Sequence, residues 1–417
     1  MGIFDEPITH EPITEFTPCV NGFAGTEENN TFACRDLDLY TFLSHEALGS
    51  EARFGSDIWG WTYEDAEKKG EKREFGLVGQ YEGTAFVEIV GAGKVLYLGR
   101  LPTQSVGSIW RDIKVIGDYA YIGSEAEGHG IQVFDLKKSL ALEPKTFSID
   151  TDLTAWHDLP IGRSHNIVSH AGKNLIAAVG SVPRDDACRA GLIFVDVTDP
   201  ANPKSAGCAW EDGYTHDAQC LTYIGPDTKY NGSDICYAYN EDSFTIYDIT
   251  DPAEPAIISR TGYYGVSYSH QGWVVDELDQ RYVLLDDELD ELNSTGWAAD
   301  QRTVTYIWDI QNLSAPILTG HYKSPQKAID HNLYVVDGLA YESNYGSGLR
   351  VIDVSSVAAD PTGAGFKEVA FFDVHPEDDD VGGIAEFTGS WSVYPYFESG
   401  YILVNSIERG LFVLKRS

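Results

Sequence analysis

Four histidines of this chain occur in short phrases that are similar to one another and recur 51, 54 and 61 residues apart. The phrases read RSHNIV at 163–168, YTHDAQC at 214–220, YSHQGW at 268–273 and AIDHNLY at 328–334. Their histidines are His165, His216, His270 and His331. Neutral imidazole is the commonest metal ligand in proteins, and a set of imidazoles suits iron, zinc, copper or manganese rather than calcium. These four residues are therefore candidate ligands of one divalent transition metal.

Tryptophan stands at the corresponding place in three further phrases: SDIWGWT at 56–62, SIWRDIKV at 108–115 and TGSWSVY at 388–394. The phrases predict that Trp59, Trp110 and Trp391 wall an apolar pocket beside the histidines. The alternative is a stacked rim that plugs the space. Arg111 and His129, the latter in the GHG loop at 128–130, are added to the pocket prediction. Arg111 is expected either to pair with Asp112 or to act as an anion clamp.

Acidic residues form a third recurring element. Several of these phrases begin an expected first strand, and an acidic residue lies near the end of the second strand that follows. A carboxylate behind an imidazole fixes its tautomer and raises its basicity as a ligand. The alternative is that such groups hydrogen bond only to one another and to water. The predicted supporting carboxylates are Glu125, Glu241, Glu288, Glu342 and Glu408.

The elements that must position these residues form a repeat. A strand that ends in an acidic residue recurs along the chain, as in IFVDVTDPANP at 193–203 and TIYDITDPAEP at 245–255. An Asp at a strand end can hydrogen bond the turn backbone, and Pro ends the strand pairing. Units of about 40–50 residues with four strands each are typical of propeller blades. We therefore predict an all-β, seven-bladed β-propeller, with six blades as the alternative because the first unit is the most degenerate.

The last unit, from Gly389 to Ser417, supplies only three strands. The segment LDLYTFLSH at 37–45 reads as the missing fourth strand, which would close the ring and leave no open edge. The predicted organisation is an N-terminal arm at 1–46, which carries Cys19, Cys34 and the closing strand, followed by the propeller at 47–417.

The six cysteines fall into three local pairs: Cys19 with Cys34, Cys188 with Cys208, and Cys220 with Cys236. Paired cysteines predict three disulfides and an exported protein, and the alternative is free thiols in the cytosol. The opening MGIFDEPITHEPITEF is acidic and polar, unlike a secretion signal, so we expect an exported segment without its leader.

The net charge of −36 argues against nucleic-acid binding, because such a surface repels phosphate backbones. No apolar run reaches the roughly 18 residues that span a bilayer, so membrane insertion is not expected. The chain also contains no GxSxG, P-loop or GxGxxG motif, which argues against the familiar classes of hydrolase and nucleotide-binding protein. The acidic segment PEDDDVGG at 376–383 is a candidate calcium loop, with solvated surface as the alternative.

The phrase VDVTDP at 195–200 resembles the LVIVD repeat. The wider set, which includes DIWGWT, SHNIV, GYTHDAQC, SHQGW, DHNLY and WSVYPYFESG, resembles the secreted choice-of-anchor B family from about Pro18 to the C-terminus. This resemblance implies export and surface attachment, and it implies no agreed activity.

Two function classes remain open. The first is a metal-dependent oxidoreductase or lyase, because a propeller with four axial histidines resembles the carotenoid-cleaving dioxygenases, which hold iron in this way. The second is a non-catalytic adhesion or scaffold module with a structural metal or none. A small molecule or a polysaccharide is the expected class of ligand.

Overall fold

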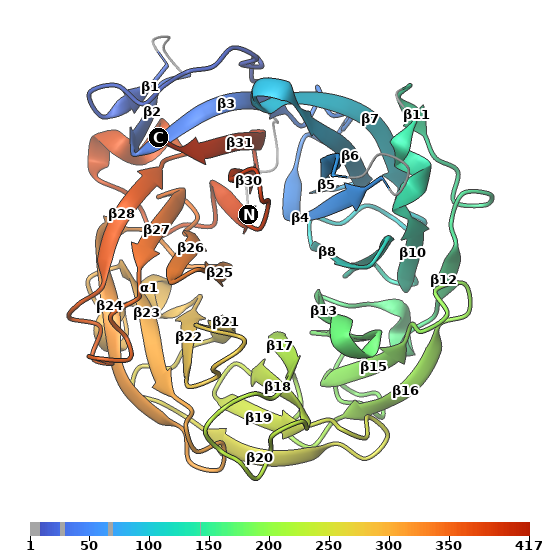
Figure 1. Ribbon diagram of the computed structural model, residues 1–417, viewed down its shortest axis with the longest axis vertical. Coiled ribbons are helices and arrows are strands. Elements are labelled where there is room, and N and C mark those ends of the chain that lie inside the picture. The colour runs from blue at the N-terminus through green and yellow to red at the C-terminus, as the bar shows by residue number, and fades with distance from the viewer. Residues whose placement is uncertain (1–8, 26–29, 66–69, 142) are drawn as a thin grey trace.

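A computed structural model describes residues 9–25, 30–65, 70–141 and 143–417. Seven sheets stand around a central axis like the blades of a propeller (Figure 1). The prediction of seven blades is confirmed, and the six-bladed alternative is wrong. Within the described ranges, no helix has the length and apolar character needed to cross a membrane.

Each blade is a sheet of four antiparallel strands whose first strand lies innermost, and blades 1 and 6 carry additional short strands. Blade 1 contains β4 (Gly55–Glu64), β5 (Lys72–Gln80), β6 (Gly83–Val90), β7 (Lys94–Pro102) and the short, parallel β11 (Lys145–Thr146). Blade 2 contains β8 (Arg111–Ile116), β9 (Tyr119–Ser124), β10 (Ile131–Asp135) and β12 (Ala155–His157). Blade 3 contains β13 (Asn166–His170), β14 (Leu175–Val179), β15 (Leu192–Asp196) and β16 (Lys204–Ala209).

The second half of the ring repeats this order. Blade 4 contains β17 (Asp217–Thr222), β18 (Asp234–Tyr239), β19 (Phe244–Asp248) and β20 (Ala256–Thr261). Blade 5 contains β21 (Ser269–Val274), β22 (Tyr282–Asp287), β23 (Arg302–Asp309) and β24 (Ile317–Lys327), with the short helix α1 (Asp290–Asn293) between β22 and β23. Blade 6 contains β25 (Leu333–Val336), β26 (Leu339–Ser343), β27 (Leu349–Asp353) and β28 (Lys367–Phe372).

The chain's ends meet in blade 7, which contains β29 (Ser390–Tyr394), β30 (Tyr401–Ser406), β31 (Gly410–Arg416) and β3 (Leu37–Ser44). The predicted closure is confirmed: β3 pairs antiparallel with β31 from Leu37 opposite Arg416 to Ser44 opposite Gly410. The hairpin of β1 (Phe23–Ala24) and β2 (Phe32–Arg35) extends blade 6, where β2 pairs with β28. The N-terminal arm therefore holds two neighbouring blades together.

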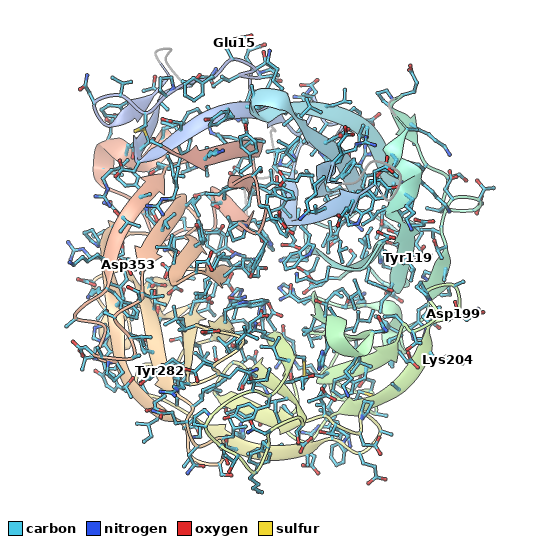
Figure 2. All side chains as sticks on the ribbon, in the orientation of Figure 1. Glu15, Tyr119, Asp199, Lys204, Tyr282 and Asp353 are labelled. Atoms are coloured by element: carbon cyan, nitrogen blue, oxygen red, sulfur yellow. A yellow bond between two sulfur atoms is a disulfide. The ribbon has the colours of Figure 1, made fainter. Side chains whose placement is uncertain are left out.

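The repeated acidic phrase is the third strand of a blade and the turn after it. Asp196 accepts a hydrogen bond from the N–H of Thr198 at 2.8 Å, and Asp248 accepts one from the N–H of Thr250 at 3.0 Å. Figure 2 shows Asp199, in one of these turns, at the outer edge of the ring. The turns that reveal the repeat in the sequence thus lie far from the axis.

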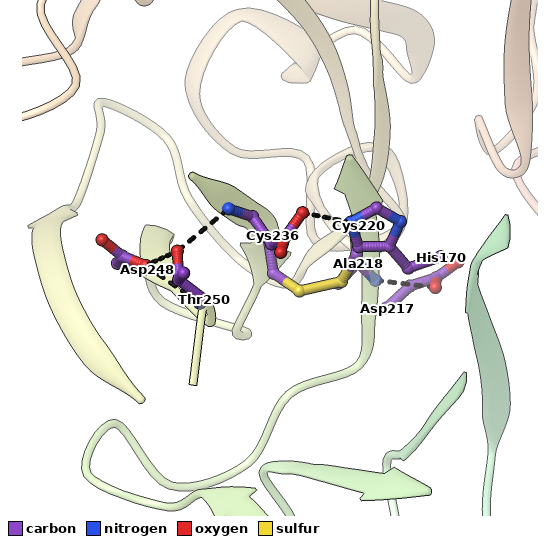
Figure 3. The surroundings of a disulfide bond; sticks show 8 residues. His170, Asp217, Ala218, Cys220, Cys236, Asp248 and Thr250 are labelled. Carbon is purple, nitrogen blue, oxygen red and sulfur yellow. Dashed lines mark hydrogen bonds and ion pairs between the residues drawn. A yellow bond between two sulfur atoms is a disulfide. The ribbon is translucent and has the colours of Figure 1, made fainter. Parts of the chain in front are cut away.

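All three predicted disulfides are present, and no free cysteine remains. Cys220 on β17 lies directly opposite Cys236 on β18, with their Cα atoms 4.1 Å apart. Figure 3 shows this disulfide beside His170 of blade 3, whose Nε2 lies 3.0 Å from Asp234 Oδ1 of blade 4. The disulfide therefore cross-links two strands within blade 4, and the contact between His170 and Asp234 joins blade 4 to blade 3.

Side chains of the innermost strands link blades that belong to separate sheets. Asp57 accepts a hydrogen bond from the N–H of Ile113 at 3.0 Å, and Asp112 accepts one from the N–H of Ile167 at 2.7 Å. Each connects one blade to the next through a backbone donor that no sheet partner satisfies. The axis is therefore lined by polar groups with structural partners.

Candidate functional site

The four histidines lie where the first strands of blades 3 to 6 begin. His165, His216 and His331 lie one or two residues before β13, β17 and β25, and His270 is the second residue of β21. The second strand of a blade runs antiparallel to the first, so the end of the second strand lies beside the start of the first. This local topology brings histidines and the acidic residues after β9 and β22 to the same mouth of the ring.

The imidazoles form a continuous arc. Ring centroids are 4.3 Å apart for His165 and His216, 4.2 Å for His216 and His270, and 4.5 Å for His270 and His331. The Trp391 ring continues the arc, 5.0 Å from His331. The fold thus brings together all four histidines that the sequence singled out.

Every Nδ1 atom in this arc faces a hydrogen-bond acceptor. The acceptor is the Glu125 carboxylate for His165 (2.5 Å) and the Asp286 carboxylate for His270 (2.7 Å). It is the His270 carbonyl for His216 (3.0 Å) and the Trp391 carbonyl for His331 (2.6 Å). A neutral imidazole that donates from Nδ1 carries its lone pair on Nε2, so all four rings are set to offer Nε2 as a ligand.

Glu288, which directly follows β22, faces the Nε2 side of the arc. Its carboxylate lies 3.6 Å from His331 Nε2 and 4.0 Å from His270 Nε2. The Tyr345 hydroxyl donates to Glu288 Oε1 at 2.7 Å and holds the carboxylate in place. Among the described residues, His216, His270 and Glu288 form a group whose ligand atoms all lie within 4.8 Å of one another. This group is more compact than the four histidines together, and binding of one ion by all four stays a prediction.

Burial controls the protonation of the arc. It lowers the pKa of His216 and of His270 well below the usual value, with further lowering by neighbouring histidines, and it lowers the pKa of His331 to about 3. Burial also lowers the pKa of His165, but the hydrogen bond and charge of Glu125 outweigh it and raise this pKa overall. Burial raises the pKa of Glu288 to about 6. Three of the four rings are therefore neutral near pH 7, the form that binds metals.

A cavity of about 250 Å³ opens in front of the arc. His165, His216, His331 and Glu288 line its floor, and aromatic side chains form much of its wall. The tyrosine hydroxyls of Tyr214 and Tyr268 lie 3.0 Å apart and add polar groups to it. The aromatic side chains of the wall are Trp110, Tyr214, Tyr268, Tyr345, Phe387 and Trp391.

Of the five predicted supporting carboxylates, only Glu125 lies behind a histidine, and Glu288 lies in front of the rings. The other three serve different partners. Glu241 pairs with Arg184 at 2.8 Å, and Glu342 accepts hydrogen bonds from Thr305 (2.8 Å) and Asn344 (3.1 Å). Glu408 accepts from the N–H of Gly389 at 3.0 Å. The five do not share one place in the repeat, because Glu342 lies inside β26 opposite Leu333, whereas Glu125, Glu241 and Glu288 follow the second strand of their blades.

Trp110 and Trp391 line the cavity, whereas Trp59, Arg111 and His129 do not. Trp59 lies five residues into β4, where it packs on Tyr334 with ring centroids 5.6 Å apart. The position equivalent to Trp110 in blade 1 is near Gly55, so the alignment of Trp59 was four residues off.

Arg111 is buried between blades 1 and 2. It donates to the Gln80 carbonyl and to His129 Nε2, both at 3.0 Å, while Asp112 pairs with Lys114 instead. The predicted pair with Asp112 is not present. Inside the blade contact Arg111 uses its Nε and Nη1 atoms, Nη2 has no hydrogen-bond partner among the described residues, and the anion clamp stays a prediction.

Asp286 and Tyr345 are the contributors that the sequence did not single out by role. Asp286 lies in the run Asp286-Asp287-Glu288, where strand alternation turns its side chain toward His270 and sends Asp287 to the N–H groups of Ser267 and Tyr268. The run itself was the available signal. In the acidic segment at 376–383, Glu377 pairs with Arg409 and Asp378 accepts from the N–H of Ile384 at 2.9 Å, and calcium there stays a prediction.

Comparison with known proteins identifies the repeat and the fold. Residues 109–128 match the LVIVD repeat, and the match falls on β8 and β9 rather than on the Asp-Pro turns. No curated protein matches the chain. The crystal structure of the computationally designed Ika8 protein is similar with a TM-score of 0.50 and 9% identity, over 98% of each chain, and this likeness concerns the fold alone. A functionally unknown protein from Desulfotomaculum acetoxidans gives a TM-score of 0.47 at 11% identity, over 76% of this chain and 89% of that one.

Proposed function

We propose that this protein is an exported metal-dependent enzyme whose metal is held by His216, His270 and Glu288 at one mouth of the propeller. The observation that carries the proposal is that every Nδ1 of the histidine arc has an acceptor, which leaves the Nε2 atoms free beside the partly buried carboxylate of Glu288. Two imidazoles and one carboxylate are a donor set of mononuclear iron and zinc enzymes.

The chain's own residues divide the work. Asp286 orients His270 and raises its basicity as a ligand, and the Tyr345 hydroxyl holds Glu288. Three protein ligands leave coordination positions open toward the cavity, where a bound metal would polarise a substrate oxygen or activate O₂. This chemistry supports an oxidoreductase or a lyase.

The cavity supports a small organic substrate rather than a long polymer. Its volume of about 250 Å³ is slightly below the range typical of ligand pockets, and its wall is largely aromatic. The hydroxyls of Tyr214 and Tyr268 would bind a polar group of such a substrate. His165 and His331 flank the three metal ligands and would donate protons to the substrate or accept protons from it.

Export is supported by the three disulfides, since disulfides persist in oxidising compartments. Surface attachment of the choice-of-anchor B kind would place the enzyme on the outside of a cell. The competing function is a non-catalytic surface module in which the same metal is structural.

The experiment is elemental analysis of the purified protein, followed by chelation and assays for oxygen consumption. We expect about one equivalent of iron or zinc, lost in His216→Ala/His270→Ala and kept in the control His321→Ala, whose ring stacks on Trp297 in the outer part of blade 5. No metal in the wild type, or equal metal in the double variant, would overturn the site. A bound metal whose removal only lowers the melting temperature would favour the surface module.

A further inference from the structure

A second group of acidic side chains lies between blades 5 and 6, outside the site described above. Asp290 and Glu291 begin the helix α1 of blade 5, and Asp330 comes shortly before β25 of blade 6. One carboxylate oxygen from each residue lies within 4.8 Å of the other two. The three side chains therefore converge from two blades on one point.

These carboxylates are enclosed, and several of their oxygens have no partner. The exposed fractions are 0% for Asp290, 0% for Glu291 and 2% for Asp330. The Tyr306 hydroxyl donates to Asp290 Oδ2 at 2.5 Å, and the N–H of Val304 donates to Glu291 Oε1 at 3.1 Å. The remaining oxygens, Asp290 Oδ1, Glu291 Oε2 and both oxygens of Asp330, lack any hydrogen-bond partner.

Asp330 is the independent observation that points to a ligand. It belongs to a different blade from the other two, it is almost fully buried, and neither of its oxygens is used. In the described part of the chain, no lysine, arginine or histidine forms an ion pair with any of the three carboxylates. A buried ionised carboxylate without a partner costs several kcal/mol. Either protons or a bound cation remove that cost, and the convergence of three carboxylates from two blades on one point favours a cation.

The donor set selects the kind of cation. It offers only oxygen, which hard cations prefer and which suits calcium better than zinc or copper. Two oxygens bound to the same calcium at about 2.4 Å lie at most about 4.8 Å apart. The three carboxylate oxygens lie within 4.8 Å of one another, so one calcium ion can reach all of them. Magnesium usually keeps several waters, and three protein carboxylates enclosed between two blades favour the ion that accepts more protein ligands.

We propose that Asp290, Glu291 and Asp330 bind one calcium ion between blades 5 and 6. This ion is distinct from the transition metal, and it fixes the two segments that carry Glu288 and His331. Its binding does not depend on the histidine arc.

The test measures calcium content and melting temperature with and without EGTA. The wild type is expected to retain about one equivalent of calcium and to melt about 3–5 °C lower in EGTA, because a ligand that binds only the folded state stabilises it. Asp330→Asn/Glu291→Gln is expected to lose the calcium and the EGTA effect. It should also melt higher than the wild type in EGTA, because it removes unpaired buried charge.

Two control variants make the test specific. Asp379→Asn/Asp380→Asn, in the acidic segment at 376–381, and His216→Ala/His270→Ala are both expected to keep the calcium. A wild type without calcium and without an EGTA effect would overturn the proposal. Loss of calcium in Asp379→Asn/Asp380→Asn would also overturn it. If Asp330→Asn/Glu291→Gln does not fold, terbium luminescence of the wild type, excited through nearby aromatic rings, replaces it. We expect a terbium signal that calcium displaces, and the absence of such a signal would contradict the site.

Discussion

Two groups of buried carboxylates, each lying between neighbouring blades, differ in how their charge is balanced. In the first, Lys114 lies 2.9 Å from Asp112 and 3.5 Å from Asp57. In the second, Asp290, Glu291 and Asp330 meet with no basic side chain in an ion pair with them, within the residues that the structure describes. Both groups connect neighbouring blades, so position in the fold does not explain the difference.

The pKa values follow the same division. Burial lowers the pKa of Lys114, but the charges of Asp112 and Asp57 outweigh it and hold this pKa well above its usual value. Burial raises the pKa of Glu291 well above its usual value, and the neighbouring acids raise it further. A lysine completes the first group within the chain itself, whereas for the second we propose a cation from solution. The comparison shows that similar groups of buried carboxylates differ in whether a lysine of the chain balances their charge, and the group without one is where we propose an ion.

The largest effect is expected when the first group is made like the second. Lys114→Met leaves Asp57 and Asp112 buried without their cation, and we expect a loss of about 3–5 kcal/mol in the free energy of unfolding. Denaturant unfolding in the presence of EGTA measures it. The exposed pair of Lys72 and Glu398 supplies the control, since Lys72→Met should leave stability unchanged. A change at Lys114 no greater than at Lys72 would show that the counter-ion does not matter.

Glu342 is an intermediate case, because neutral donors rather than a contacting cation hold it. Burial raises its pKa from 4.5 to about 7. The folded state therefore binds this proton more tightly than the unfolded state, so its stabilising effect is present below pH 4.5 and is lost as the pH rises toward 7. Glu342→Gln should remove that loss.

The difference in unfolding free energy between Glu342→Gln and the wild type is expected to grow in favour of the variant by up to about 3 kcal/mol from pH 4.5 to pH 8. Unfolding curves at both pH values measure it, with exposed Glu398→Gln as the control. A pH-independent difference would mean that Glu342 stays ionised, and that two neutral donors balance a buried charge well enough.

The same comparison explains what the sequence could predict. Repetition gave the seven blades, because strand turns such as Asp196 and Asp248 recur in register. The incomplete last unit gave the closing strand, and the local pairing of the cysteines gave the three disulfides. Repetition also located the histidine arc. It failed where equivalent positions carry different neighbours: Glu241 turns to Arg184, while Glu125 turns to His165.

The convergence of Asp290, Glu291 and Asp330 could not be predicted from the sequence. Asp290 and Asp330 are 40 residues apart and belong to no shared phrase, so only the packing of blade 5 on blade 6 brings them together. The prediction that Trp59 lines the pocket was wrong for a related reason. The first strand of blade 1 is longer than those of the other blades, so the position equivalent to Trp110 lies about four residues before Trp59.

The smallest effect is expected from a change that keeps shape and removes one charge from the balanced group. Asp112→Asn retains an oxygen for the N–H of Ile167, and Lys114 retains Asp57. We expect a loss of about 1–2 kcal/mol in the free energy of unfolding. The sign of this change in unfolding free energy is informative, because in EGTA the same Asp-to-Asn change at Asp330 is expected to stabilise the protein. A gain in stability at Asp112 would erase the distinction between the two groups.

We propose a transition metal at the mouth of the ring where the histidine arc lies. Anomalous diffraction from crystals of the protein, measured on both sides of the absorption edges of iron and zinc, tests most directly whether a metal ion balances the charge there. The account predicts a peak bounded by His216 Nε2, His270 Nε2 and the Glu288 carboxylate, at about 2.0–2.2 Å from each if zinc is bound. No transition-metal peak in this group after reconstitution with iron or zinc, or a peak at another place in the molecule, would contradict it.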